Sequence, residues 1–277
     1  MNNNDILKPG RRQVLGKLGS LSMLALFGCG GGEESAGAAT ASASSAAGTA
    51  APATNAAADT AAAPTPVSST GVAQTAAGSC TLIPTETEGP YPLLAILGNS
   101  AMVRRDITEG KAGVPLTLVL NLRNVGSTCA PISNAAVYVW HCDKDGGYSG
   151  YSSNANGNHQ GETFLRGIQV SDSAGQVTFT TIYPGWYAGR ITHIHFQVYL
   201  NDNLRVTATA TSQLGFPQSV TEAVYASSLY STHGQNSTVR GFAADNVFSD
   251  GTEYQIASVT GDVNSEFVAT LDVGIRA

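Results

Sequence analysis

Residues 176–200 read QVTFTTIYPGWYAGRITHIHFQVYL. Residues 176–183 alternate polar and apolar side chains, which is the period of a strand with one buried face. Residues 193–200 form a second run of this kind, rich in the β-branched and aromatic side chains that favour strands. The two runs therefore predict two strands joined by a loop, and they indicate the class of fold for the rest of the domain.

The same pattern continues on both sides of this stretch. Three further runs predict strands: residues 116–122, 136–142 and 267–275. Residues 204–211 form another run, and the Asn201-Asp202-Asn203 segment before it predicts a hairpin with residues 193–200. Helical periodicity is weak, and only residues 219–230 predict one or two helical turns. We therefore expect an all-β fold, an antiparallel β-sandwich core with long loops, over residues 79–277.

The segment before this domain begins as a targeting signal. In residues 1–29, an arginine pair at positions 11 and 12 precedes a modest apolar run that is too short to span a bilayer. The pair resembles a twin-arginine export signal. The run ends in Leu26-Phe27-Gly28-Cys29, which resembles a bacterial lipobox with Cys29 as the lipidated residue. Cleavage at another bond, without a lipid, is the alternative.

Residues 30–78 consist mostly of Ala, Ser, Thr, Gly and Pro. Such a segment cannot bury enough apolar surface to offset the entropy of ordering it, so we expect a disordered linker. Behind a lipidated Cys29, this linker would hold the folded domain away from a membrane as a flexible tether. We therefore expect an exported protein of the periplasm or cell envelope that touches the membrane through its lipid anchor.

The charge of the chain narrows the choice of partners. The net charge of −6 at pH 7 argues against nucleic acid or an anionic membrane surface, and the few positive charges are scattered. The sequence has no Gly-rich nucleotide loop, so neither nicotinamide nor flavin is expected. Whether the chain forms a homo-oligomer is left open by the sequence.

The cysteines predict one disulfide. If Cys29 carries a lipid, Cys80, Cys129 and Cys142 remain. In an oxidising compartment this number predicts one disulfide and one spare thiol. Because Cys142 lies in a strand of the candidate site, we favour a Cys80–Cys129 bond. Three unpaired thiols are the alternative.

His193 and His195 are the first candidate metal ligands. On a strand they share one face, about 6–7 Å apart by the strand rise, so both imidazoles can reach one ion. Ile194 and Phe196 then point to the opposite, buried face. The nearby Tyr187 offers a hard phenolate oxygen that suits ferric iron. A His-x-His pair also occurs in zinc and copper sites, so a zinc or copper hydrolase-like site is an alternative.

A second tyrosine segment strengthens the metal interpretation. Residues 140–151 leave a strand and enter a Gly-rich loop, and loops held by a rigid sandwich are where ligands gather. From about residue 80 onward, the chain resembles the intradiol ring-cleavage dioxygenases, and among these an exported branch related to the protocatechuate 3,4-dioxygenase β subunit. The matching pieces stand in family order: Thr87-Glu88-Gly89-Pro90-Tyr91, Arg105-Asp106-Ile107, Gly113-Val114-Pro115-Leu116, the segment 140–151, Arg166-Gly167, Thr181-Ile182-Tyr183-Pro184-Gly185-Trp186-Tyr187, and Gly189-Arg190 before His193-Ile194-His195.

The resemblance implies one non-haem Fe(III) ion and a set of site residues. The four implied ligands are Tyr148, Tyr187, His193 and His195. Arg190 is implied as the group that stabilises negative charge on the substrate, and Gln213 is implied as a pocket residue by a looser match. Tyr187 has a second implied role, because it would leave the metal and accept a substrate proton.

The implied reaction is cleavage of a catechol-type ring between its two hydroxylated carbons, with both atoms of O2 entering a muconate-type dicarboxylic acid. Better-known relatives carry Pro and Trp after the second ligand tyrosine, where this chain has Ala188-Gly189. The departure implies a more open pocket that admits larger or lignin-derived catechols, so the sequence does not name the substrate. The alternative function is a non-catalytic envelope lipoprotein that binds aromatic or carbohydrate ligands.

Overall fold

The structure is a computed structural model, and it describes residues 80–277. The predicted signal segment with Cys29 and the predicted linker, residues 30–78, lie outside the described residues, so these two features stay predictions. No helix in the described part of the chain is long and apolar enough to cross a membrane.

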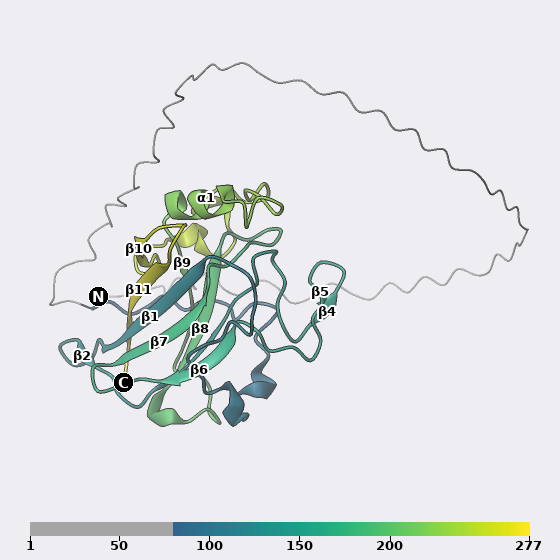
Figure 1. The fold of residues 1–277 in the computed structure, drawn as a ribbon. Coiled ribbons are helices and arrows are strands. Elements are labelled where there is room, and N and C mark those ends of the chain that lie inside the picture. The colour runs from purple at the N-terminus through teal and green to yellow at the C-terminus, as the bar shows by residue number, and fades with distance from the viewer. Residues whose placement is uncertain (1–79) are drawn as a thin grey trace, which may run out of the picture. The chain divides into compact units, whose positions relative to one another are not determined.

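The domain is built on two main β-sheets (Figure 1). The first sheet consists of β1 (Pro115–Asn124), β2 (Ala130–Pro131), β7 (Gln176–Ile182), β10 (Ser258–Gly261) and β11 (Phe267–Ile275). The second sheet has the order β6 (Arg166–Val170), β3 (Ala136–Trp140), β8 (His193–Tyr199) and β9 (Ala210–Gly215). The strand pairs are antiparallel except for β1 with β11, which run parallel. The expected all-β class is therefore confirmed, with one parallel pair in a sandwich that we expected to be antiparallel.

The remaining elements are short. β4 (Ser152–Ser153) and β5 (Gly157–Asn158) form a two-stranded hairpin. The α-helix α1 (Gln218–Ala226) overlaps residues 219–230, which predicted helical turns, and begins one residue earlier. Five 3-10 turns complete the described chain: η1 (Leu94–Ile96), η2 (Ser100–Met102), η3 (Leu200–Asp202), η4 (Phe242–Ala244) and η5 (Phe248–Asp250).

The main core lies between the two sheets. In β1 every second side chain is buried, and the four leucines at positions 116, 118, 120 and 122 face inward. They share one hydrophobic cluster with Val137 and Val139 of β3 and with Ile194 and Phe196 of β8. Each fully buried aliphatic side chain contributes about 1.5–3 kcal/mol to folding. The alternation of polar and apolar residues in β1 therefore arises because this strand buries one of its two faces.

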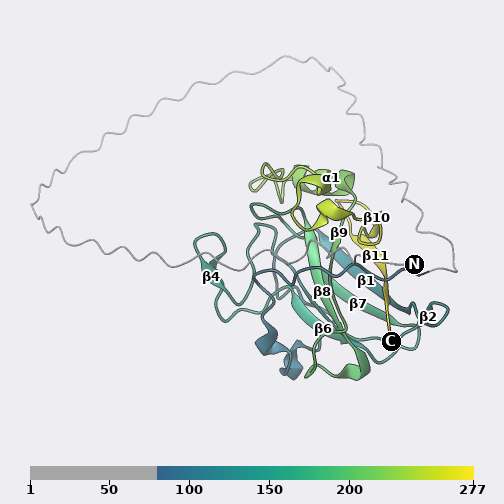
Figure 2. The same cartoon turned by 180° about the vertical axis from the view of Figure 1, so that it is seen from behind.

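The outer face of the second sheet is buried as well. All residues of β3 and β8 are buried, so these two central strands are covered on both faces. The cover comes from the chain before β1, since Tyr91, Ile96 and Met102 pack against Tyr138 and Trp140 in a second cluster. Figure 2 shows this N-terminal part of the described chain crossing the sheet over β8. The covered face holds the candidate site.

One predicted strand is displaced. The run at residues 204–211 was expected to pair with β8, but the partner strand is β9, which begins at Ala210. After β8 the chain makes the 3-10 turn η3, in which Asn201 and Asp202 have positive φ angles of 56° and 50°, and it does not pair with β8 again until Ala210. The connection is longer as a result, and Gln213 lies inside β9, directly opposite His195 of β8.

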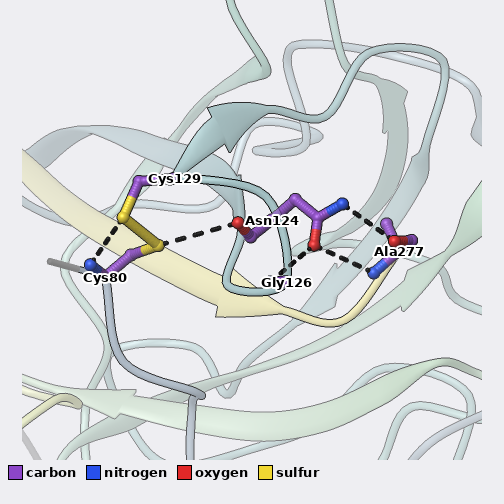
Figure 3. Close-up of a disulfide and its surroundings, with 5 residues drawn as sticks. All are labelled: Cys80, Asn124, Gly126, Cys129 and Ala277. Atoms are coloured by element: carbon purple, nitrogen blue, oxygen red, sulfur yellow. Dashed lines mark hydrogen bonds between the residues drawn. A yellow bond between two sulfur atoms is a disulfide. The ribbon is translucent and has the colours of Figure 1, made fainter.

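The structure pairs Cys80 with Cys129, and Cys142 is buried and free. The favoured disulfide is therefore confirmed. It joins the first described residue to the turn that follows β1, where Asn124 Nδ2 also donates to the carbonyl oxygen of Ala277 over 2.8 Å (Figure 3). Both ends of the described chain are thus held at the same end of β1.

Replacing both Cys80 and Cys129 by serine is expected to lower the free energy of unfolding by about 2–4 kcal/mol, because the bond closes a loop with a sequence separation of 49. Denaturant unfolding of the oxidised proteins measures the difference. Adding a reductant should lower the free energy of unfolding of the wild type to that of the variant, and it should leave the variant's value unchanged. Equal stability of the two oxidised proteins would contradict the prediction.

Candidate active site

A row of buried residues crosses the second sheet. Trp140 of β3 lies opposite Arg166 of β6 on one side and opposite His195 of β8 on the other. Gln213 of β9 lies opposite His195 and continues the row. All four side chains are at most 1% exposed. Strand register alone therefore brings an arginine, an indole, an imidazole and an amide, each from a different strand, to one line.

The four predicted ligands converge beside this row. The Nε2 atoms of His193 and His195 lie 3.1 Å apart. The hydroxyl oxygens of Tyr148 and Tyr187 each lie 3.4 Å from Nε2 of His193. The two histidines share one face of β8, as the spacing predicted, while both tyrosines come from loops. The structure therefore brings together all four residues that the resemblance implied as ligands.

The loop that carries Tyr148 is fixed by its own polar side chains. Asn156 accepts a hydrogen bond from the backbone N–H of Tyr148 over 2.7 Å and donates to the carbonyl of Tyr148 over 2.9 Å. Asp143 accepts from the N–H of Gly147 and forms an ion pair with Lys111. Both ends of the turn are thus anchored, and the ring of Tyr148 is directed at His193.

The two tyrosine loops touch through glycines. A side chain at Gly146 would place Cβ 2.3 Å from the carbonyl oxygen of Trp186, and one at Gly185 would place it 2.3 Å from the carbonyl oxygen of Lys144. Gly146 also has a φ of 91°, in the region that favours glycine. These contacts let the backbones of the two loops meet, so Tyr148 and Tyr187 approach the same point.

Burial controls the protonation of these groups. Burial raises the pKa of Tyr148 well above its usual range and raises the pKa of Tyr187 to about 12. The same cause lowers the pKa of His193 to about 3 and that of His195 well below its usual value. The imidazoles are therefore neutral and able to act as ligands at neutral pH. The phenols need a strong cation nearby before they ionise.

Arg190 is the charged group next to the donors, and Asp245 holds it. Its Nε donates to the Asp245 carboxylate over 2.9 Å, and its Nη2 donates to the Gln213 side-chain oxygen over 2.6 Å. Gln213 in turn donates to the carbonyl of Thr87 over 2.7 Å. The structure thus brings Gln213, which the looser match implied as a pocket residue, into contact with Arg190. The positive charge of Arg190 lowers the pKa of Tyr187 and partly offsets the effect of burial.

Three residues of the site received no firm role from the sequence. The ring of Tyr91 stacks on Tyr148 with centroids 4.8 Å apart, which places Tyr91 at the site rather than only in the N-terminal segment. Arg166 is fully buried and donates to the Tyr91 carbonyl, to the Tyr138 hydroxyl and to both oxygens of Ser149. Trp140 stacks on His195. Their contacts depend on strand register and on the N-terminal cover, and no local sequence pattern signals them.

Other aromatic and histidine residues are excluded from the donor group. His141 points away, with its ring nitrogens 2.8 Å from the Cys142 carbonyl and 2.7 Å from the Thr181 hydroxyl. The Tyr151 hydroxyl accepts from the Leu93 N–H, and Tyr183 belongs to the main core. These contacts give both tyrosines packing roles and not roles as ligands.

Metal binding here requires the tyrosines. In residues 80–277, no three or more His, Cys, Asp or Glu side chains come together as a metal site. A cavity of about 650 Å³ does lie beside α1, lined among others by Thr192, Phe216 and Tyr225, but none of the four predicted ligands lines it. We therefore locate the candidate site by its donor atoms and not by the size of a cavity.

Comparisons with known proteins point to one family of enzymes. The family model described as "Dioxygenase" matches residues 97–219. The structure is similar to an intradiol ring-cleavage dioxygenase from Tetranychus urticae, with 29% identity, a TM-score of 0.62, and coverage of 71% of this chain and 95% of that chain. A 3-chlorocatechol 1,2-dioxygenase from Rhodococcus opacus 1CP matches at 17% identity and a TM-score of 0.47, covering 72% of each chain. No curated protein matches the sequence. By the family model and the Tetranychus structure, the chain is similar to the intradiol ring-cleavage dioxygenases, a family of oxidoreductase enzymes.

Proposed function

We propose that this protein is an Fe(III)-dependent intradiol dioxygenase. It cleaves a catechol-type ring between the two hydroxylated carbons, with O2, to give a muconate-type dicarboxylic acid. The observation that carries the proposal is the convergence of two phenol oxygens and two imidazole nitrogens, with neighbouring donors 3.1–3.4 Å apart. The similarity to intradiol ring-cleavage dioxygenases supports it.

The donor set fits a ferric ion. Nitrogen and oxygen ligands lie about 2.0–2.2 Å from a small metal ion, and two such ligands on one ion lie about 3 Å apart. Two phenolates offset much of a trivalent charge, and two neutral imidazoles complete the set. When bound, ferric iron would act as a Lewis acid on a chelated catechol.

Tyr187 is the residue that would move a proton. It is only partly buried, whereas Tyr148 is fully buried. Tyr187 also lies in a loop next to Gly189, whose φ is 88°. Of the two tyrosines it is therefore better placed to leave the donor group. Its freed Oη would accept a proton from a catechol hydroxyl.

Arg190 would stabilise negative charge on the substrate. Its guanidinium is already fixed by Asp245 and Gln213, so it needs no reorganisation when charge develops. Tyr91 and the N-terminal segment around it cover the donors and limit access of water from that side.

The substrate pocket is proposed to be open near residues 188 and 189. A Cβ atom at Gly189 would meet no other atom within 4 Å, so this edge of the Tyr187 loop faces free space. An open edge suits catechols with bulky ring substituents. The expected anchor at Cys29 would place this enzyme in the cell envelope.

The test uses the full chain loaded with iron. We expect a visible phenolate-to-iron charge-transfer absorption and O2 uptake with a panel of catechols. The product mass should exceed that of the substrate by two oxygen atoms. A colourless iron-loaded protein would refute the ligand assignment. A coloured protein without O2 uptake on any catechol would favour a non-catalytic binding lipoprotein.

A further inference from the structure

The two histidines of the candidate site are held in different ways. His193 Nδ1 lies 2.5 Å from the carbonyl oxygen of Ile191, a hydrogen bond that fixes the ring and leaves Nε2 for the metal. His195 has no such bond. Its Nδ1 is buried, and no group of the described residues accepts from it. Metal-binding histidines almost always donate their second ring N–H to an oxygen, so another contact must orient His195.

Trp140 supplies a contact of the right shape. Its ring is parallel to the His195 ring within 3°, with centroids 4.8 Å apart. The two residues lie directly opposite each other on neighbouring strands, so the register of β3 and β8 fixes their separation. A parallel stack restricts rotation of the imidazole about its Cβ–Cγ bond, which is the motion that a hydrogen bond to Nδ1 would restrict.

Trp140 is itself held rigidly. Its ring stacks on Tyr138 with centroids 4.8 Å apart, and the Tyr138 hydroxyl donates to the Pro92 carbonyl and accepts from Arg166. The stack therefore ends on a fully buried guanidinium with four oxygen partners. His195 receives its orientation from this rigid group.

Gly89 lies at the edge of the His195 ring and limits movement of the imidazole in that direction. A Cβ at Gly89 would lie 3.1 Å from Cε1 of His195, so the backbone of the N-terminal segment comes close to the imidazole edge. The φ of 68° at Gly89 also favours glycine. The indole thus restrains a face of the ring, and the segment before β1 restrains an edge.

We propose that Trp140 is a positioning residue for His195, and that its stacked indole takes the place of the missing hydrogen bond at Nδ1. The inference rests on the proposed metal site. It predicts that the flat face of the side chain at position 140, and not only its volume, sets how tightly iron is held.

The experiment compares Trp140→Leu and Trp140→Phe with wild type in the full chain. Phe179→Leu is the matched control, because Phe179 is equally buried but belongs to β7 and the main core. The affinity for iron, measured by competition with a chelator, should be about 10–100-fold lower in Trp140→Leu than in wild type. This is the range typical of losing a residue that supports a metal ligand. Trp140→Phe and Phe179→Leu should stay close to wild type. If Trp140→Leu does not fold, Trp140→Met takes its place.

A second readout needs no metal. In iron-free wild type the indole should shift the His195 ring-proton NMR signals upfield, and this shift should vanish in Trp140→Leu. The chain has five histidines, so single substitutions suffice to assign the signals. Wild-type iron retention in Trp140→Leu, or an equal loss in Phe179→Leu, would overturn the inference and leave the proposed function intact. A wild type that binds no iron would overturn both.

Discussion

Replacing Tyr148 by phenylalanine is expected to remove one of the two phenolate ligands, which weakens and shifts the charge-transfer absorption and reduces kcat/KM by at least about a thousandfold. The hydroxyl oxygen of Tyr148 lies 3.4 Å from His193 Nε2, and the Tyr148 side chain is fully buried. A ligand charge of this kind contributes several kcal/mol, and each 1.36 kcal/mol is a factor of ten in rate. Iron analysis, the visible spectrum and O2 uptake measure the effect.

The control for this substitution is Tyr183→Phe. Tyr183 is also fully buried, and its hydroxyl lies 2.7 Å from that of Thr221, away from the donors. It loses one hydrogen bond, which is worth about 1 kcal/mol of stability, and should keep iron, colour and activity. If Tyr148→Phe keeps its iron and an unchanged visible spectrum while Tyr183→Phe behaves like wild type, Tyr148 is not a ligand.

The strands β1 and β7 were predictable because each buries one face. The alternation in residues 116–122 and 176–183 became β1 and β7, and the leucines of β1 fill the core. The loop after β8 was not predictable from composition, because the chain makes the 3-10 turn η3 and pairs with β8 again only at Ala210. A run of β-forming residues becomes a strand only where the preceding loop lets it pair with a neighbouring strand. In residues 204–211 this pairing begins only at Ala210.

The ligand set was accessible from sequence motifs, but the supporting residues were not. His193 and His195 share a strand, so period-two spacing predicts their common face. The stack of Trp140 on His195 joins strands 55 residues apart and depends on their register. The contact of Tyr91 with Tyr148 depends on a segment that crosses from the other end of the domain. Local patterns carry neither kind of information.

Replacing Arg190 by methionine is expected to have two large effects. Activity should fall about 10²–10³-fold, the usual consequence of removing one preorganised charge from a buried site. Stability should fall by about 3–5 kcal/mol, because the Asp245 carboxylate is completely buried and loses its cation. Steady-state O2 uptake and denaturant unfolding measure the two effects separately.

The pH dependence of the stability difference between wild type and Arg190→Met tells whether the loss comes from the broken ion pair with Asp245 or only from the smaller side chain. Burial acts to raise the pKa of Asp245, but the Ile191 N–H and Arg190 outweigh it, and the pKa lies below its usual value. A lowered carboxyl pKa contributes stability above the unfolded-state value of 3.8, and that stability is lost as the pH falls through the folded-state pKa. The stability difference between wild type and Arg190→Met should therefore be full at pH 7 and narrow below about pH 4.

Arg190→Lys separates charge from geometry. A lysine keeps a positive charge near Asp245 but cannot reach both the carboxylate and Gln213 in the fixed geometry of a guanidinium. It should recover most of the stability lost in Arg190→Met while its activity stays low, because the cation is no longer aimed at the substrate. Equal recovery of stability and activity would mean that any cation at this position suffices, and that the contact with Gln213 has no part in catalysis.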